Sequence, residues 1–272
     1  MYKRILVPLD GSRFSEEIIP YAAGLAAVHD TDLTFLRVVN TASRKDEAAA
    51  YVEQLASAWN ARSLCVLAPG DVAQAVLKES DHKPITLLAM TSRGHSGLAE
   101  ALLGSVAQRV MRDAGGPVLM YHPNGRHDPG HLPVQVNHVM LALDGGTPSE
   151  TMAGDAARFA QWINADLEVV SVIGSPTAAE IGEASTGEMT SLESSYVRSR
   201  AHQLGKQYGV EVNWDTLHGD PAKAITEHVG SRHDIILAMT TRRQDALEAA
   251  VLGSVTASCL RTAGVPVLMR LP

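Results

Sequence analysis

Cysteine and long apolar runs are scarce in this chain of 272 residues. Its two cysteines, Cys65 and Cys259, are too few for a disulfide framework and suit a reducing compartment. No apolar run approaches the ~20 residues that a membrane-spanning helix needs. The first residues also lead into a predicted strand rather than a secretory signal. We therefore expect a cytoplasmic protein without a membrane partner.

Positive charge is also in deficit. Lys and Arg number 23 against 30 Asp and Glu, which gives a formal net charge of −7. A general nucleic-acid binder needs a basic face to neutralise phosphates, so we expect no nucleic-acid partner. A single site for a small anion remains compatible with this charge. The apolar content of 45% is enough for a core, and the length suggests about two domains.

The sequence contains two copies of one pattern. An apolar run ending at Asp10 recurs as one ending at Asp144, at an offset of 144 − 10 = 134. Three later landmarks recur at an offset of 149: Thr91, Gly104 and Pro117 match Thr240, Gly253 and Pro266. An insertion of 149 − 134 = 15 residues between Ile173 and Gly219 accounts for the change. We expect a first domain at residues 1–123, a linker at 124–135 and a second domain at 136–272.

Each copy alternates short apolar strands with helix-length segments. In the first copy we expect strands at residues 3–9, 33–39, 63–67, 85–90 and 117–121, and helices at 12–29, 47–60, 71–79 and 104–114. Such alternation favours right-handed crossovers and a parallel sheet. The prediction is an α/β fold of two tandem Rossmann-like domains, each a five-stranded, mostly parallel sheet with helices on both faces.

Local signals refine this prediction. Thr147 and Glu150 have the spacing of a capping box, whereas Asp71 and Asp220 are expected to cap later helices. The insertion, rich in Ser, Thr, Ala, Gly and Glu, is expected to form a surface loop before a helix near residues 193–208. The last strand of each copy needs a partner at its edge, so we expect the two to pair as an intrachain pseudo-dimer.

A ligand site is expected where strand order reverses, beyond the carboxyl ends of the strands. The loop after the first strand carries Asp10, and a second loop runs from Thr91 to Ser105. Glycines in that loop (Gly94, Gly97 and Gly104) are expected to supply positive φ or a close backbone approach. Ser105 opens a helix whose free N–H groups favour phosphate, and Arg93 adds charge. On local sequence alone, Asp10 is equally compatible with a helix cap or a turn.

These residues resemble the universal stress protein family in its tandem two-domain form. Its nucleotide-binding members carry a glycine, two residues, a second glycine, nine residues, and a glycine followed by Ser or Thr; here Thr91, Gly94, Gly104 and Ser105 hold those positions. The resemblance implies an adenine nucleotide alpha hydrolase-like fold that binds ATP or AMP, with Mg²⁺ near Asp10. By resemblance the nucleoside contacts are Pro8, Asp10 and Val38, and the phosphate contacts are Gly94, Gly104, Ser105 and Val106.

The motif departs from the family pattern at two places. Thr91 replaces the first glycine, and a β-branched residue is costly at positive φ. In the second copy, Thr240 and Arg243 replace both early glycines. The retained counterparts are Asp144, Val172, Gly253 and Ser254. We expect the second pocket to be empty or filled by Arg243, the alternative being an anion held by Arg242 and Arg243.

Three functional classes remain open. The favoured class is a stress-response or signalling protein whose first half binds an adenine nucleotide, while the second half is a pseudo-symmetric scaffold. Whether two whole chains also form a homodimer is left open. A slow ATPase is an alternative, although only Asp10 offers a base. A partner-binding protein with two decayed sites is the third. Four histidines cluster around the linker and are interpreted as linker histidines rather than metal ligands: His122, His127, His131 and His138.

Overall fold

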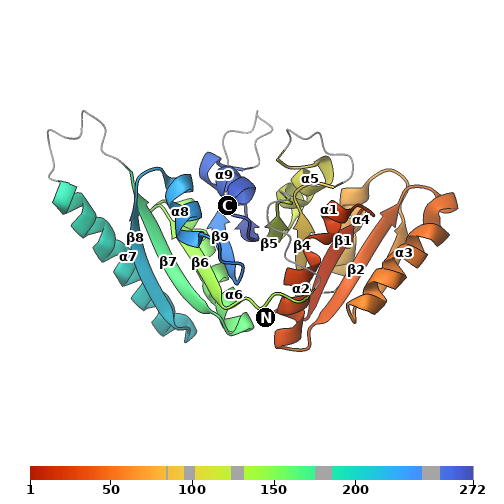
Figure 1. Cartoon of the computed structure of the whole chain (residues 1–272), viewed down its shortest axis with the longest axis horizontal. Coiled ribbons are helices and arrows are strands. Elements are labelled where there is room, and N and C mark those ends of the chain that lie inside the picture. The colour runs from red at the N-terminus through yellow and green to blue at the C-terminus, as the bar shows by residue number, and fades with distance from the viewer. Residues whose placement is uncertain (84, 95–101, 124–131, 175–185, 241–251, 272) are drawn as a thin grey trace.

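A single sheet runs through both copies in the computed structural model (Figure 1), which describes residues 1–83, 85–94, 102–123, 132–174, 186–240 and 252–271. Within these residues the sheet has ten strands in the order β3-β2-β1-β4-β5-β10-β9-β6-β7-β8. The first half contributes β1 (Arg4–Leu9), β2 (Asp32–Val39), β3 (Arg62–Leu67), β4 (Thr86–Thr91) and β5 (Val118–Tyr121). The second half contributes β6 (His138–Leu143), β7 (Asp166–Ile173), β8 (Val212–His218), β9 (Ile235–Thr240) and β10 (Val267–Arg270).

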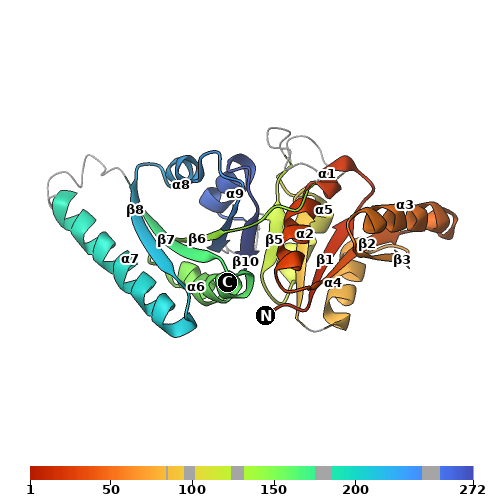
Figure 2. The same cartoon turned by 60° about the horizontal axis from the view of Figure 1, so that its bottom comes forward.

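Helices cover both faces of this sheet (Figure 2). The first half has α1 (Arg13–Glu16), α2 (Ile19–Val28), a 3-10 turn at Ala42–Arg44, α3 (Lys45–Ala58), α4 (Val72–His82) and α5 (Ser105–Asp113). The second half has α6 (Thr147–Ile163), α7 (Thr186–Tyr208), α8 (Pro221–Val229) and α9 (Ser254–Thr262). The predicted α/β class, with two tandem Rossmann-like units, is confirmed.

Two apolar cores lie on opposite faces because side chains alternate along each strand. Ile5, Val7 and Leu9 of β1 belong to the core that α2, α3, α6 and α7 cover. Leu6, between them, belongs to the core that α4, α5, α8 and α9 cover. The inner strands are therefore buried on both sides, as their continuous apolar runs predict, whereas the edge strands β3 and β8 are largely exposed or half-buried. The chain order also reverses between β1 and β4, which leaves space beyond their carboxyl ends.

The two halves join through β5 and β10, which pair antiparallel with Leu119 opposite Leu268. All other neighbouring strands in the described sheet are parallel. The predicted pairing of the two last strands is thus confirmed. The N-terminus also crosses the junction, since Tyr2 packs edge-on against Phe159 and Trp162 of α6 at centroid distances of 6.4 and 5.0 Å.

Residues next to the junction have changed as a pair between the copies. In the first half, the buried rings of Tyr21 and Tyr121 lie 5.9 Å apart. Their counterparts, at offsets of 134 and 149, are Asp155 and Arg270, which form an ion pair of 2.8 Å. Asp155 also pairs with Arg158 at 2.6 Å. A buried carboxylate needs such partners, so the second half replaces an aromatic contact by a charged one.

The predicted first helix, residues 12–29, is wrong as a single element. The structure has α1, a turn at Glu17–Ile18, and then α2 with Pro20 in its first turn. Proline has no N–H to donate to the carbonyl four residues earlier, so it favours a helix start rather than a helix interior. The second half has Gly154 at this position, and there α6 is continuous.

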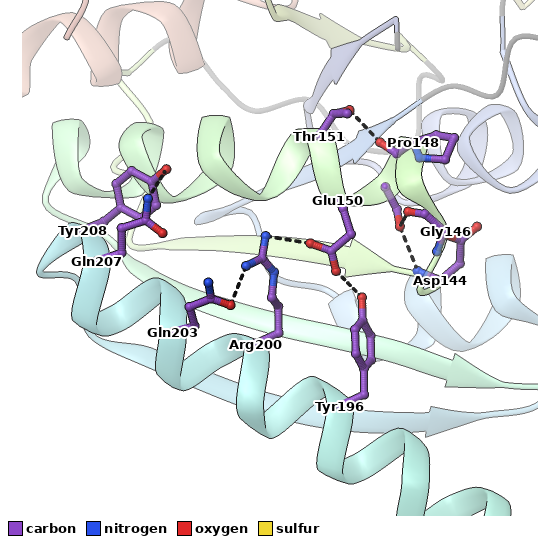
Figure 3. Close-up of polar contacts among 11 residues, drawn as sticks. Asp144, Gly146, Pro148, Glu150, Thr151, Tyr196, Arg200, Gln203, Gln207 and Tyr208 are labelled. Atoms are coloured by element: carbon purple, nitrogen blue, oxygen red, sulfur yellow. Dashed lines mark hydrogen bonds and ion pairs between the residues drawn. The ribbon is translucent and has the colours of Figure 1, made fainter.

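The predicted capping box at Thr147 is also wrong. The N-cap of α6 is Gly146, which has no side chain, and its N–H donates to Asp144 Oδ1. Asp144 thus takes the acceptor role expected of Glu150, which turns toward α7 instead. The Glu150 carboxylate accepts a hydrogen bond from Tyr196 and pairs with Arg200 at 2.6 Å (Figure 3). By contrast, Asp71 and Asp220 cap α4 and α8 as predicted, accepting from Gln74 N and Lys223 N.

The link between Glu150 and Tyr196 recurs in the first half, where Tyr51 donates to Glu16 at 2.7 Å. The equivalence of the two tyrosines gives an offset of 196 − 51 = 145. The 15 additional residues of the second half therefore fall in two places rather than in one insertion. There are 145 − 134 = 11 before Tyr196 and 149 − 145 = 4 after it. α7 also begins earlier than predicted, at Thr186.

The chain that connects the halves rests on α2. Val134 donates its N–H to the carbonyl of Pro20 at 2.9 Å, and its own carbonyl lies against Gly24. A Cβ on Gly24 would stand 1.8 Å from that oxygen. Glycine is therefore required here for space, since it allows two backbones to touch.

We predict that Gly24→Ala destabilises the protein although alanine is the better helix former. The overlap with the Val134 backbone forces a shift, and overpacking of this kind costs about 1–3 kcal/mol. Thermal unfolding followed by circular dichroism should show a lower Tm. Gly115→Ala is the matched control, because no atom lies within 4 Å of the added methyl. An unchanged Tm in Gly24→Ala would contradict the close contact.

Candidate functional site

A cavity of about 110 Å³ opens beyond the carboxyl ends of β1, β2 and β4. All nine residues predicted for the first-half site border it: Pro8, Asp10, Val38, Thr91, Arg93, Gly94, Gly104, Ser105 and Val106. Apolar walls come from both sides of the slot, with Leu36 from β2, Val72 and Val76 from α4, and Met90 from β4. The volume is below the ~300 Å³ at which sites begin to enclose a whole small molecule. It suits part of a ligand, with the remainder at the mouth.

Asp10 forms a turn and also borders the cavity. One carboxylate oxygen, Oδ1, accepts hydrogen bonds from the backbone N–H and the hydroxyl of Ser12, at 2.9 and 2.6 Å. Ser12, rather than Asp10, is the N-cap of α1. The other oxygen, Oδ2, is directed toward Gly94, where a Cβ would lie only 1.9 Å away. Asp10 is thus a turn former whose second oxygen lies at the cavity wall.

Gly94 and Gly104 do not have the predicted positive φ. Gly94 is absent from the described residues with positive φ, and Gly104 has φ −69°. What Gly94 provides is space for the Asp10 carboxylate. Gly104 donates its N–H to Ser92 O at 2.7 Å, and a Cβ there would meet its nearest atom at 3.6 Å. Close approach therefore requires glycine at position 94 but not at position 104.

The start of α5 provides the phosphate-binding features expected of it. Gly104 is the N-cap and makes no side-chain cap, so the first N–H groups of α5 remain available to a ligand. Ser105 is exposed, and Val106 borders the cavity in the same turn. Such a helix start favours negative charge through its N–H groups and its dipole.

Thr91 fits the cavity without strain. It ends β4 in extended conformation, opposite Tyr121 of β5, and its hydroxyl donates to Arg93 O at 3.0 Å. The cost of a β-branched residue at positive φ, expected from the motif, therefore does not arise. Arg93 itself lies over the ring of Phe14, 5.3 Å from the centroid, and donates to Pro123 O at 2.6 Å.

A buried Ser–His pair lies next to the cavity and is missing from the sequence prediction. Ser92 Oγ and His122 Nδ1 share a hydrogen bond of 2.6 Å. The sequence could have predicted this pair, because Ser92 and His122 each directly follow a strand, and β4 and β5 are parallel neighbours whose ends lie side by side. Ser92 is completely buried, so its hydroxyl does not face a substrate. The pair fixes the start of the loop rather than forming a nucleophile. The second half has Leu271 in place of His122.

Burial, reinforced by the charges of Arg93 and Arg261, lowers the pKa of His122 to about 4. We predict that the folded protein keeps this imidazole neutral at pH 5 to 7, whereas the unfolded chain binds its proton near pH 6.5. Between those pKa values the unfolded state holds more protons, so the free energy of unfolding falls as the pH is lowered. The contribution of this residue has a limiting slope of about 1.4 kcal/mol per pH unit.

Urea denaturation between pH 4.5 and 7 measures that slope. His122→Gln should remove part of it, while His29→Gln, at an exposed histidine, should retain it. NMR titration of the His122 ring should give a midpoint near 4. A midpoint near 6.5 would show that the imidazole is accessible to water and would contradict the buried pair.

A second cavity, of about 280 Å³, occupies the equivalent place in the second half. Five of the six predicted counterparts border it: Asp144, Val172, Thr240, Gly253 and Ser254. Arg243 lies outside the described residues, as do Arg242 and Gly97. The local geometry repeats that of the first half, because Asp144 N donates to Ser149 Oγ just as Asp10 N donates to Ser15 Oγ, both at 3.3 Å.

Within the described part of the chain, no group of three or more His, Cys, Asp or Glu side chains is arranged to hold a metal ion. His127 and His131 fall outside that part. None of the described helices combines the length and the apolar character that a membrane crossing requires. Cys65 and Cys259 are both free thiols.

Comparison with known proteins agrees with this architecture. A family model described as the universal stress protein family matches residues 1–122 and 135–270. Universal stress protein MJ0531 of Methanocaldococcus jannaschii is 28% identical over 139 residues, which are 44% of this chain and 82% of that protein. Universal stress protein Mb2028c of Mycobacterium bovis is 26% identical over 189 residues, 67% of this chain and 61% of its own.

Among solved structures, a universal stress protein from Archaeoglobus fulgidus aligns with 100% of this chain and 99% of its own, with a TM-score of 0.69 and 22% identity. A putative universal stress protein from Pseudomonas aeruginosa covers 100% of this chain with a TM-score of 0.64 and 16% identity. At these identities the likeness concerns the fold. Because the family model matches both halves, the chain belongs to the universal stress protein family, as a tandem two-domain member.

Proposed function

We propose that this member acts in the cytoplasm as a stress-response or signalling protein whose first half binds an adenine nucleotide, ATP or AMP. The second half serves as its pseudo-symmetric scaffold. The observation that carries the proposal is the convergence of all nine predicted residues on one cavity at the switch point of the sheet. The residues come from β1, β2, β4 and the start of α5, so chance clustering along the sequence does not explain it.

Each part of the cavity suits one part of a nucleotide. The apolar slot formed by Leu36, Val38 and Met90 suits the flat base. The mouth, with the free N–H groups of α5, the Ser105 hydroxyl and Arg93, suits the phosphates. Asp10 is the only carboxylate among the described lining residues and would hold a Mg²⁺ ion together with phosphate oxygens, as Mg²⁺ sites commonly do.

Binding without turnover is favoured by the same geometry. Asp10, the candidate base, has one oxygen already engaged by two hydrogen bonds from Ser12. Ser92 is buried against His122. A bound nucleotide would then act by stabilising the conformation that it prefers, including any further pairing of whole chains.

Gly94→Ala tests the proposal most directly. The added methyl would stand 1.9 Å from Asp10 Oδ2, so the carboxylate must leave its place. We expect nucleotide affinity to fall by about tenfold or more, equivalent to ~1.4 kcal/mol. Gly115→Ala is the control, because Gly115 does not border the cavity and no atom lies within 4 Å of the added methyl. Its affinity for nucleotide should change by less than about threefold.

The measurement has two steps. Gently purified protein is denatured, and the released nucleotides are identified by HPLC and mass spectrometry. Emptied protein is then titrated calorimetrically with Mg-ATP and with AMP. About one nucleotide per chain, weakened in Gly94→Ala alone, supports the proposal. No bound nucleotide and no heat of binding would leave a partner-binding protein instead, and two equivalent sites per chain would refute the scaffold role of the second half.

A further inference from the structure

A third cavity, of about 260 Å³, lies beyond the carboxyl ends of β1 and β2, on the face of the sheet opposite the first cavity. Helices α4 and α5 border the first cavity, whereas α3, which packs on β2 and β3 (Figure 2), borders this one. All its described lining residues lie between positions 10 and 51, in a continuously described part of the chain. Among them only Asp10 and Arg37 also border the first cavity. The third cavity is therefore a separate space from the proposed nucleotide site.

Two arginines border this cavity without a carboxylate partner among the described residues. The side chain of Arg37 is half-buried, and its only hydrogen bonds there run from Nη1 to Leu9 O and Val38 O, at 3.4 and 3.3 Å. Both are longer than the ~2.9 Å typical of such bonds. A guanidinium presents its N–H donors as a planar fork that matches a carboxylate, so most of this capacity is unused. Arg44 is exposed, and its side chain makes no hydrogen bond or ion pair to a described residue.

Negative charge borders the same cavity. Glu47 lies in the first turn of α3, is exposed, and makes no side-chain hydrogen bond or ion pair to a described residue. Asp10 contributes a second carboxylate, one oxygen of which is bound by Ser12. A ligand with a single negative charge would be repelled by these carboxylates, and one with a single positive charge would be repelled by the two guanidinium groups. A ligand that has both charges is attracted by both sets.

The remaining walls of the cavity are apolar. Val39 and Ala48 are buried, and the hydroxyl of Tyr51 is already bound to Glu16 at 2.7 Å. A short aliphatic group would leave water on entering this part of the cavity, which favours its binding. The volume is below the ~300 Å³ at which sites begin to enclose drug-sized molecules, so the cavity suits a smaller one.

The second half lacks the residues that form this cavity. At the offsets of 134 and 145, Ser171 and Glu193 stand where the first half has Arg37 and Ala48. The Ser171 hydroxyl donates to the Glu193 carboxylate, which joins β7 to α7 across the equivalent space. A small residue at position 48 is thus what leaves the space open in the first half.

We infer that the third cavity binds a small zwitterion of the α-amino-acid type with a short aliphatic side chain. The ligand carboxylate would pair with the fork of Arg37, supported by Arg44. Its ammonium group would meet Glu47 and Asp10, and its side chain would lie against Val39. The first half would then respond to two ligands, a nucleotide on one face of the sheet and an amino acid on the other.

The test uses the full chain and L-valine as the probe. Calorimetric titration should show one site per chain. L-valinamide lacks the carboxylate and isovalerate lacks the amino group, so each should bind at least about tenfold more weakly than L-valine. Val106→Phe places a ring in the first cavity, and this variant should bind L-valine as the unchanged chain does. No nucleotide is needed for these results, so failure of the nucleotide proposal would leave them unaffected.

Two variants change the lining. The double variant Arg37→Ser with Ala48→Glu copies the serine–glutamate pair of the second half, so it should fold, and it should weaken L-valine binding by about tenfold or more. Arg44→Gln should weaken binding by about threefold or more. Arg13→Gln is the matched control, because Arg13 is also exposed but does not border the cavity. Circular dichroism and Tm show that each variant is folded.

Three results would overturn the inference: no binding of L-valine at millimolar concentration, binding of isovalerate or L-valinamide as tight as that of L-valine, or unchanged affinity in both the double variant and Arg44→Gln. Loss of L-valine binding in Val106→Phe would also overturn it, because the ligand would then occupy the first cavity.

Discussion

The antiparallel pairing of β5 with β10 is the contact on which the architecture depends. Each half would otherwise expose a four-residue apolar edge strand, a template for uncontrolled pairing. Joining the two edges builds one sheet, and it places equivalent helices on the same face, so that α2, α3, α6 and α7 share one core. Burial is therefore continuous across the junction, and Val118, Met120, Val267 and Met269 belong to the core on the opposite face.

Having formed this junction, the copies were free to diverge in compensating pairs. The replacement of Tyr21 and Tyr121 by Asp155 and Arg270 changes both members of one contact. A change at position 270 alone would leave the buried Asp155 carboxylate with Arg158 as its remaining arginine partner, and loss of a partner by a buried charge is destabilising. The constraint comes from packing and not from ligand binding, since neither pair borders either cavity among the described lining residues.

The sequence predicts the fold and the convergence of nine residues on the first cavity, because both depend on period and topology. Apolar runs fix the strands, and parallel strands bring the residues that follow them to one edge. Predictions that needed tertiary partners failed. Glu150 does not form the predicted capping box but contacts Tyr196 and Arg200 of α7. Gly94 is required to leave space for the Asp10 carboxylate, not to adopt a positive φ. Local spacing contains no information about such distant atoms. The break at Pro20 was readable and follows from proline chemistry.

Topology alone creates a cavity in each half, because the chain order reverses between β1 and β4 and again between β6 and β9. What a cavity binds is decided afterwards by a few side chains around it. The first half has Arg37 and Arg93 near the start of α5, which favours phosphate. In the second half Ser171 stands in place of Arg37 and hydrogen-bonds to Glu193, and Arg200 of α7 pairs with Glu150 in the first turn of α6. The same fold therefore leaves each half with its own set of lining side chains, and those side chains, rather than the topology, distinguish the two cavities.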